Sequence, residues 1–125
     1  MRGATLDAGA LTAFERAKRS IVALITRALE RGAVLAVPAG VIAQVWRDGA
    51  RQARLVRLLA SDLTEVVPLD DSTARAVGQL CGISGATDVV DVSVVLCARE
   101  RGHVVVTGDP ADLRRVDPRM EFVRI

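Results

Sequence analysis

Two aspartates at the front of an apolar segment are the first residues here whose type and spacing could do chemistry. In "TDVVDVSVVLCARERG", Asp88 and Asp91 stand three positions apart, ahead of a run of valines. Residues three apart share a helix face, so a helix at this point would present both carboxylates together. Asp109 follows the strand-like run "HVVVT", and Asp7 follows the apolar run "ATL" near the N-terminus. We treat these four acids as candidates for one site.

Short apolar runs alternate with helical patterns along the whole chain, and these elements must position the acids. We expect strands at 4–6, 33–37, 64–69, 103–107 and 121–125. We expect helices at 8–17, 21–32 with Ser20 as its N-cap, 39–49, 50–61, 70–82, 88–102 and 110–116. This alternation predicts an α/β fold, a three-layer α/β/α sandwich around a mainly parallel central sheet. The length of 125 residues suits a single domain, 1–125.

The predicted sheet would bring the acids to one edge, because sites in open parallel sheets form beyond the carboxyl ends of the strands. Asp7 and Asp109 each come directly after a strand, and Asp88 and Asp91 open the helix that leads into strand 103–107. Two carboxylates 4 Å apart repel by about 4 kcal/mol at an effective dielectric of about 20. Such a cluster must take up protons or bind a cation.

The chemistry of the candidate ligands favours one kind of metal. Oxygen ligands without histidine or cysteine select Mg²⁺ or Mn²⁺ rather than zinc. A water on such an ion can become a nucleophile toward a phosphodiester bond. The acids therefore point to metal-assisted hydrolysis of a phosphate ester.

Ordinary structural roles account for each acid taken alone. Asp109 before Pro110 is typical of a helix N-cap. Asp88 and Asp91 have the spacing of an N-cap and an acid that complements the helix dipole. Asp7 could be a turn residue, and the pair at 70–71 is interpreted as capping its helix. The metal hypothesis depends on several acids reaching one edge together.

Composition narrows the possible partners without choosing one. Phe14, Trp46 and Phe122 are the only aromatic residues, which argues against nucleic-acid recognition by stacking on exposed rings. The net charge of +2 is a weak bias. Lys18 is the only lysine among 17 basic residues, and the arginines that make up the rest suit phosphate.

The remaining reactive residues carry structural interpretations. Cys81 and Cys97 lack metal-site spacing and are read as buried thiols of a reduced, cytoplasmic compartment. His103 opens a strand, which favours a surface or edge role, and Trp46 is assigned to core or interface packing. No apolar stretch approaches the roughly 18 to 20 residues of a membrane span, and no signal peptide is recognisable, so no membrane partner is expected.

Three segments together resemble the PIN domain family, in particular VapC-type ribonuclease toxins of bacterial type II toxin–antitoxin systems. They are "LDAGALTAFE", "TDVVDVSVVLCARERG" and "VVVTGDPADL", and the resemblance spans nearly the full chain. It implies a PIN-like α/β/α sandwich and an endoribonuclease dependent on Mg²⁺ or Mn²⁺. It also implies a substrate of the tRNA or rRNA class, a homodimer and a cognate antitoxin.

The resemblance carries over to individual positions. Asp7 matches the family's first acid, and Asp91 matches the acid that opens the late helix. Asp109 matches the acid after the fourth strand, with Thr107 as the family's threonine. Asp88 is an additional acid on the face of Asp91 and could share the metal. The implied metal ligands are therefore the aspartates at 7, 91 and 109, with the one at 88 beside them.

One position departs from the family pattern. The family's second acid is usually a glutamate in a short helix after the second strand, and here that position is Gln44 in "VPAGVIAQVWR". An amide can donate to phosphate or hold a metal-bound water, but it brings no negative charge. An inactive PIN module that binds RNA or antitoxin is therefore an alternative. A phosphoacceptor signalling domain, which also gathers acids at strand ends, is a further alternative. Such a domain needs a lysine after a late strand, where this chain has only Arg124.

Overall fold

A computed structural model describes residues 2–125, and its centre is a five-stranded sheet whose neighbouring strands are all parallel. The strand order is β3-β2-β1-β4-β5. The strands are β1 (Ala4–Leu6), β2 (Leu35–Pro38), β3 (Thr64–Val67), β4 (Val104–Thr107) and β5 (Phe122–Arg124). β1 lies in the middle, and every residue of β1 and β2 is buried, as expected for strands covered on both faces.

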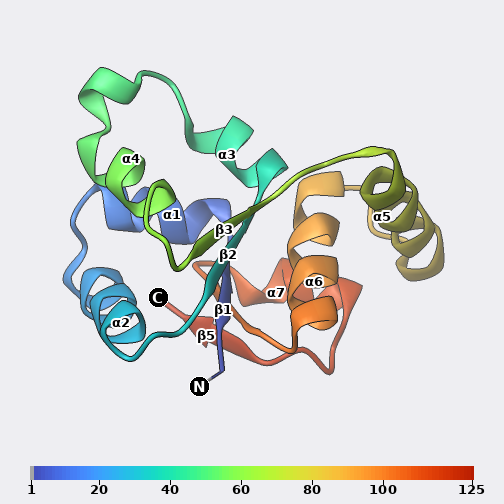
Figure 1. Ribbon diagram of the computed structural model, residues 1–125. Helices are drawn as coiled ribbons and strands as arrows, with labels where there is room; N and C mark the ends of the chain where they lie inside the picture. Colours follow the sequence, from blue (N-terminus) through green and yellow to red (C-terminus); the bar gives the residue numbers. More distant parts are fainter. Residues whose placement is uncertain (1) are drawn as a thin grey trace.

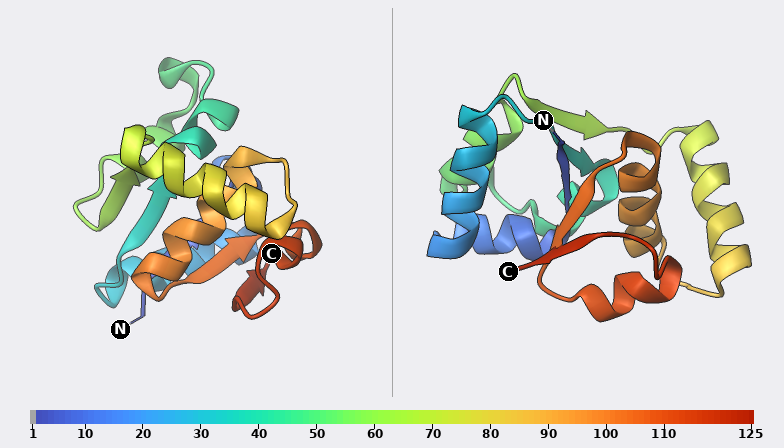
Figure 2. Two further views of the ribbon diagram at one scale, coloured as in Figure 1. Left: turned by 90° about the vertical axis from the view of Figure 1, so that its right-hand side faces the viewer. Right: turned by 90° about the horizontal axis from the view of Figure 1, so that it is seen from below.

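Helices cover both faces of the sheet (Figures 1 and 2). One layer contains α1 (Ala8–Glu15), α2 (Arg19–Glu30) and α4 (Ala53–Leu59). The opposite layer contains α5 (Asp71–Ser84), α6 (Val89–Arg101) and α7 (Pro110–Val116). The helix α3 (Ala39–Val45) and the 3₁₀ turn η1 (Gly49–Arg51) follow β2 at the end of the sheet. The predicted three-layer α/β/α sandwich is confirmed, and the sheet is parallel throughout.

The two helices that precede β4 pack differently from each other. α6 lies against the sheet with five buried residues, whereas α5 packs on the outside of α6 (Figures 1 and 2). No single helix within residues 2–125 is long and apolar enough to cross a membrane. The pair α5 and α6 has the length and composition together, but the chain bends by 103° between them.

The start of α2 differs from the sequence-based prediction. The helix begins at Arg19, so Ser20 lies inside its first turn and is not the N-cap. Lys18 takes the cap position without a side-chain hydrogen bond. The cause is the end of α1, where Ala17 adopts a positive φ of 59° and the Lys18 amide donates to the Ala13 carbonyl. This turn leads the chain from α1 directly into α2.

The helix predicted over 39–49 is shorter in the structure and ends at Val45. The buried side chain of Gln52 explains the early end. Its Oε1 accepts from the amides of Arg47 and Asp48, and its Nε2 donates to the Val45 carbonyl. These three bonds satisfy backbone groups that a longer helix would have paired internally, and they form the turn that leads into η1.

The core is aliphatic, as the composition predicts. The exposure of Trp46 and the burial of His103 differ from what the sequence led us to expect. Trp46 is 40% exposed and packs over Gly49, so of its two predicted roles the core role is wrong and the interface role stays a prediction. His103 is buried, not on the surface, and its Nδ1 lies 3.1 Å from the Thr5 hydroxyl. Both cysteines are free thiols, with Cys97 buried. The hydrogen bond to the central strand explains how a lone histidine is tolerated inside.

Candidate functional site

Two of the candidate acids lie where the central strands end. Asp7 follows β1 and opens α1, and Asp109 follows β4 and opens α7. The Asp7 amide donates to the Val106 carbonyl at 3.3 Å, which ties the two strand ends together. A Cβ built on Gly9 would lie 3.5 Å from the Gly108 amide nitrogen. The start of α1 and the loop that carries Asp109 are therefore in close contact.

Asp7 is a half-buried carboxylate held in one orientation. Its Oδ1 accepts from the Ala10 amide at 2.8 Å, so the side chain caps α1. Burial raises the pKa of Asp7, and nearby Asp109 raises it further. The Thr107 hydroxyl, which faces the carboxylate, and the amides of α1 partly oppose this shift of the pKa. A buried acid beside a second acid is a place that favours a cation.

Asp91 is the most strongly perturbed acid of the chain that the structure describes. Burial is the largest cause that raises its pKa, to about 6, and the charge of Asp88 is the next. The charges of Asp112, Asp7 and Asp109 add to the shift. The carboxylates of α6, α7 and the ends of β1 and β4 are therefore near enough to Asp91 for their charges to act on it.

Asp112 is the acid of this group that sequence reasoning did not select. It lies in the first turn of α7, three residues after Asp109. That spacing is the same as the spacing of Asp88 and Asp91, and it places both acids on one helix face. The signal was therefore present in "GDPAD", where it is equally typical of a helix start.

The structure separates the capping interpretation from the ligand interpretation at two positions. Asp88 is the N-cap of α6, because its Oδ1 accepts from the amides of Val90 and Asp91. Its Oδ2 takes no part in these bonds. Asp109 occupies the N-cap position of α7, as its place before Pro110 indicates, but its side chain makes no cap hydrogen bond. Its amide donates to the Thr107 hydroxyl at 3.0 Å, which leaves the carboxylate available.

The donor set fits a hard divalent cation in its chemistry. All the candidate ligands are carboxylate oxygens, and their mutual repulsion is relieved by a positive ion. Within residues 2–125, no three His, Cys, Asp or Glu side chains lie close enough together, in their present conformations, to hold a metal ion. The carboxylates would have to draw together on binding, and the exposed side chain of Asp109, which makes no cap hydrogen bond, can move to do so.

Gln44 lies on α3, exposed, beside the start of α1. It shares an open hollow with Ala8 and Gly9, the two residues that follow Asp7. The position at which the family usually has a glutamate therefore faces the Asp7 side of the site. Because the side chain is an amide, this side carries no negative charge from α3.

Replacing Asp91 by asparagine should stabilise the metal-free protein at neutral pH. The pKa of Asp91 rises from 3.8 to about 6 on folding, so the folded state favours the protonated form. The stability that this gives is complete below pH 3.8 and is lost as the pH rises through about 6. The full shift corresponds to about 3 kcal/mol, and solvent screening reduces our expectation to about 1 kcal/mol.

Urea unfolding in EDTA at pH 5 and pH 7.5 measures this effect. Wild type should lose stability between the two pH values, and Asp91→Asn should lose less. If the stabilities of the two proteins depend equally on pH, folding does not raise the pKa of Asp91.

No family model matches this sequence, and no curated protein sequence matches it. Solved structures do resemble the fold. A chain of VapBC2 from Rickettsia felis, bound to a DNA fragment of its promoter, superposes with a TM-score of 0.72 and 14% identity, covering 98% of both chains. A chain of a toxin–antitoxin complex from Klebsiella pneumoniae gives a TM-score of 0.68 at 15% identity, covering 98% of this chain and 100% of the other.

A third similar structure is FitAcB from Neisseria gonorrhoeae, with a TM-score of 0.64 and 15% identity over 97% of this chain and 96% of the other. The predicted PIN-like fold is confirmed by these likenesses. At such low identity they show the fold alone, so the function must be argued from the residues.

Proposed function

We propose that this protein is a metal-dependent endoribonuclease that acts as the toxin of a toxin–antitoxin pair. The observation that carries the proposal is the strained carboxylate of Asp91, whose pKa is raised to about 6 by its burial and by the charges of Asp88, Asp112, Asp7 and Asp109. The similar structures from Rickettsia felis and Klebsiella pneumoniae are toxin–antitoxin assemblies, which supports the same assignment.

The carboxylates of Asp7, Asp91 and Asp109 would hold the cation, with Oδ2 of Asp88 available beside them. When bound, Mg²⁺ or Mn²⁺ would supply positive charge for a phosphate and a water of lowered pKa for its hydrolysis. Thr107 acts as a positioning residue, because its hydroxyl accepts from the Asp109 amide and faces the Asp7 carboxylate.

The direct test is incubation of purified protein with structured RNA of the tRNA or rRNA class. We expect internal cleavage with Mg²⁺ or Mn²⁺ and none in EDTA. Cleavage that persists in EDTA would exclude the metal-dependent mechanism, and absence of cleavage with either metal would exclude the nuclease.

A non-catalytic PIN module that binds RNA or antitoxin is the second candidate. It is favoured by Gln44 in place of an acid and by a carboxylate cluster that is not closed in the described residues. Calorimetric titration with Mn²⁺ separates the two candidates. Absence of binding at millimolar metal would support the non-catalytic module.

An antitoxin partner has a candidate surface between α2 and α4. An open hollow there is lined by Val22, Ala23 and Thr26, with the arginines at 19, 27 and 54 around it. An apolar floor with a cationic rim suits an amphipathic helix whose flanks are acidic. We therefore propose that the antitoxin lays such a helix here.

Filling this hollow should weaken the toxin–antitoxin complex. Ala23→Glu adds bulk at an exposed position of the floor and a negative charge that repels the acidic flanks of the proposed helix. We expect at least a tenfold weaker complex, about 1.4 kcal/mol. Gln79→Glu on exposed α5 adds the same side chain elsewhere and should have no effect. Surface plasmon resonance with the product of the neighbouring gene measures both, and equal affinities would place the antitoxin on another surface.

The homodimer implied by the family resemblance also remains a proposal. Large apolar side chains are exposed around the end of the edge strand β3, at Val66, Leu69 and Val89. They adjoin an apolar groove between α5 and α6 that a second copy of the chain could cover. Sedimentation of the purified protein tests this proposal, and a monomer at micromolar concentration would contradict it.

A further inference from the structure

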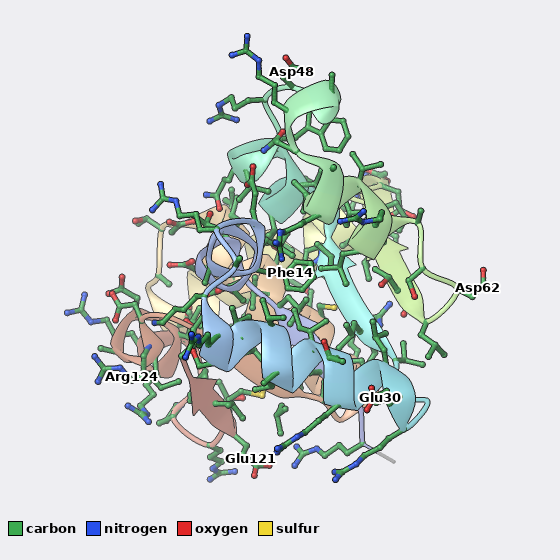
Figure 3. The ribbon with its side chains drawn as sticks, turned by 90° about the vertical axis from the view of Figure 1, so that its left-hand side faces the viewer. Phe14, Glu30, Asp48, Asp62, Glu121 and Arg124 are labelled. Carbon is green, nitrogen blue, oxygen red and sulfur yellow. The ribbon has the colours of Figure 1, made fainter. Side chains whose placement is uncertain are left out.

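An open hollow between α1 and α3 gathers positive charge beside the candidate metal site. Arg16, Lys18 and Arg47 line it together with Gln44, and its lining contains no acidic residue. A second hollow continues from it toward η1 and adds Arg51, with Glu15 and Asp48 also present there. Figure 3 shows nitrogen-tipped side chains projecting from the part of the molecule around Asp48.

The three cations of the first hollow are not used by the fold as ion pairs. In the described part of the chain, Arg16, Lys18 and Arg47 have no carboxylate within salt-bridge distance. Arg51, by contrast, lies 3.7 Å from Asp48. The Arg47 guanidinium is held at the end of α3, because its Nη1 donates to the carbonyls of Ala43 and Trp46. Like charges gathered without partners cost energy unless an anion joins them.

The hollow also borders the helix start that carries one of the candidate acids. Its lining includes Ala8 and Gly9, which follow Asp7 in the first turn of α1. A carboxylate at position 44 would pair with these cations and neutralise them, whereas the amide of Gln44 leaves their charge available. The neutral residue at position 44 therefore keeps the hollow receptive to anions.

We propose that this cationic groove, formed by Arg16, Lys18, Gln44 and Arg47, binds the phosphates of the RNA strand next to the cleaved bond. The assignment rests on the proposed function, which places that bond at the neighbouring acids. Arginine forks and a lysine bind phosphate oxygens, and the Gln44 amide donates a further hydrogen bond. Few exposed rings are present in the chain, so contacts to the RNA backbone take the place of base stacking.

The test is the salt dependence of RNA binding without cleavage. A labelled single-stranded RNA of about 12 nucleotides is titrated with protein in EDTA at several salt concentrations, and binding is followed by fluorescence anisotropy. Each phosphate contact contributes about 0.7 to the slope of log affinity against log salt. Arg16→Gln/Arg47→Gln should therefore lower the slope by about 1.4.

The matched control is Arg31→Gln/Arg57→Gln, which removes the same charge from exposed positions outside both hollows. It should keep the wild-type slope. Three outcomes would each contradict the proposal that the groove binds RNA. They are an unchanged slope in the groove variant, an equal loss of slope in the control, and wild-type binding that does not depend on salt. Weaker antitoxin binding with unchanged RNA binding would reassign it to the antitoxin.

The same proteins assayed with Mn²⁺ separate the groove from the nuclease. Loss of slope in the groove variant, with no cleavage by wild type, would support the groove as an RNA site while the proposed function fails. Cleavage by wild type with an unaltered slope in the groove variant would support the proposed function and exclude the groove as the RNA site.

Discussion

Asp7→Asn and Asp91→Asn should each lower metal-dependent RNA cleavage by about 10²- to 10³-fold, about 3 to 4 kcal/mol of barrier. Each substitution keeps the shape of the side chain and removes one negative charge. Asp7 lies at the end of β1 and Asp91 among four other acids, so both changes weaken cation binding at its centre. Initial rates with saturating Mn²⁺ and a defined RNA measure the loss.

Asp62→Asn provides the matched control for these variants. Asp62 is exposed on the loop before β3, at the right-hand edge of the view in Figure 3, and makes no salt bridge within the described chain. Its cleavage rate should equal that of wild type. Far-ultraviolet circular dichroism and urea unfolding establish that all three variants are folded. Cleavage by Asp7→Asn and Asp91→Asn at the wild-type rate would remove the metal site assigned here.

A further expectation concerns metal and stability together. If Mn²⁺ binds the folded cluster as proposed, and not the unfolded chain, it should raise the midpoint of wild-type unfolding. Asp91→Asn starts from a more stable metal-free state and should gain less from the ion. The two effects share their causes, because the burial of Asp91 and the repulsion from neighbouring acids both raise its pKa.

The positions of Asp7 and Asp109 could be predicted from the sequence because a general rule of parallel sheets places strand ends at one edge. The rule brings these two aspartates together only if their strands are neighbours, and β1 does lie next to β4. Asp112 could not be selected in the same way, because an acid in the first turn of a helix has an ordinary structural role. Its proximity to Asp91 depends on how α7 packs against α6, which no local pattern specifies.

Contacts between distant residues also account for the predictions that were wrong. The end of α3 is set by the buried amide of Gln52, seven residues beyond Val45. The burial of His103 depends on a hydrogen bond to Thr5, which is 98 residues away in the chain. Neither partner is identifiable from the local sequence, because glutamine and threonine are common on surfaces as well.

Gln44→Glu is expected to strengthen Mn²⁺ binding by about tenfold, about 1.4 kcal/mol. Gln44 faces the first turn of α1 across the hollow, so a carboxylate there adds negative charge on the Asp7 side of the site. The expected gain is modest because the position is exposed and water screens the charge. Isothermal titration with Mn²⁺ measures it, and Gln79→Glu on exposed α5 is the control for an added charge elsewhere.

The same substitution should weaken the RNA binding measured in EDTA, because the new carboxylate would pair with Arg16, Lys18 or Arg47 in the cationic groove. Metal affinity and RNA affinity should therefore move in opposite directions in one variant, which unfolding cannot produce. Gln79→Glu adds the same charge away from the hollow, so it measures how much of both changes comes from net charge alone. If Mn²⁺ affinity rises alone, Gln44 belongs to the metal site and not to the groove. If RNA affinity falls alone, position 44 serves the RNA backbone, and the acids at 7, 88, 91 and 109 hold the cation without help from α3.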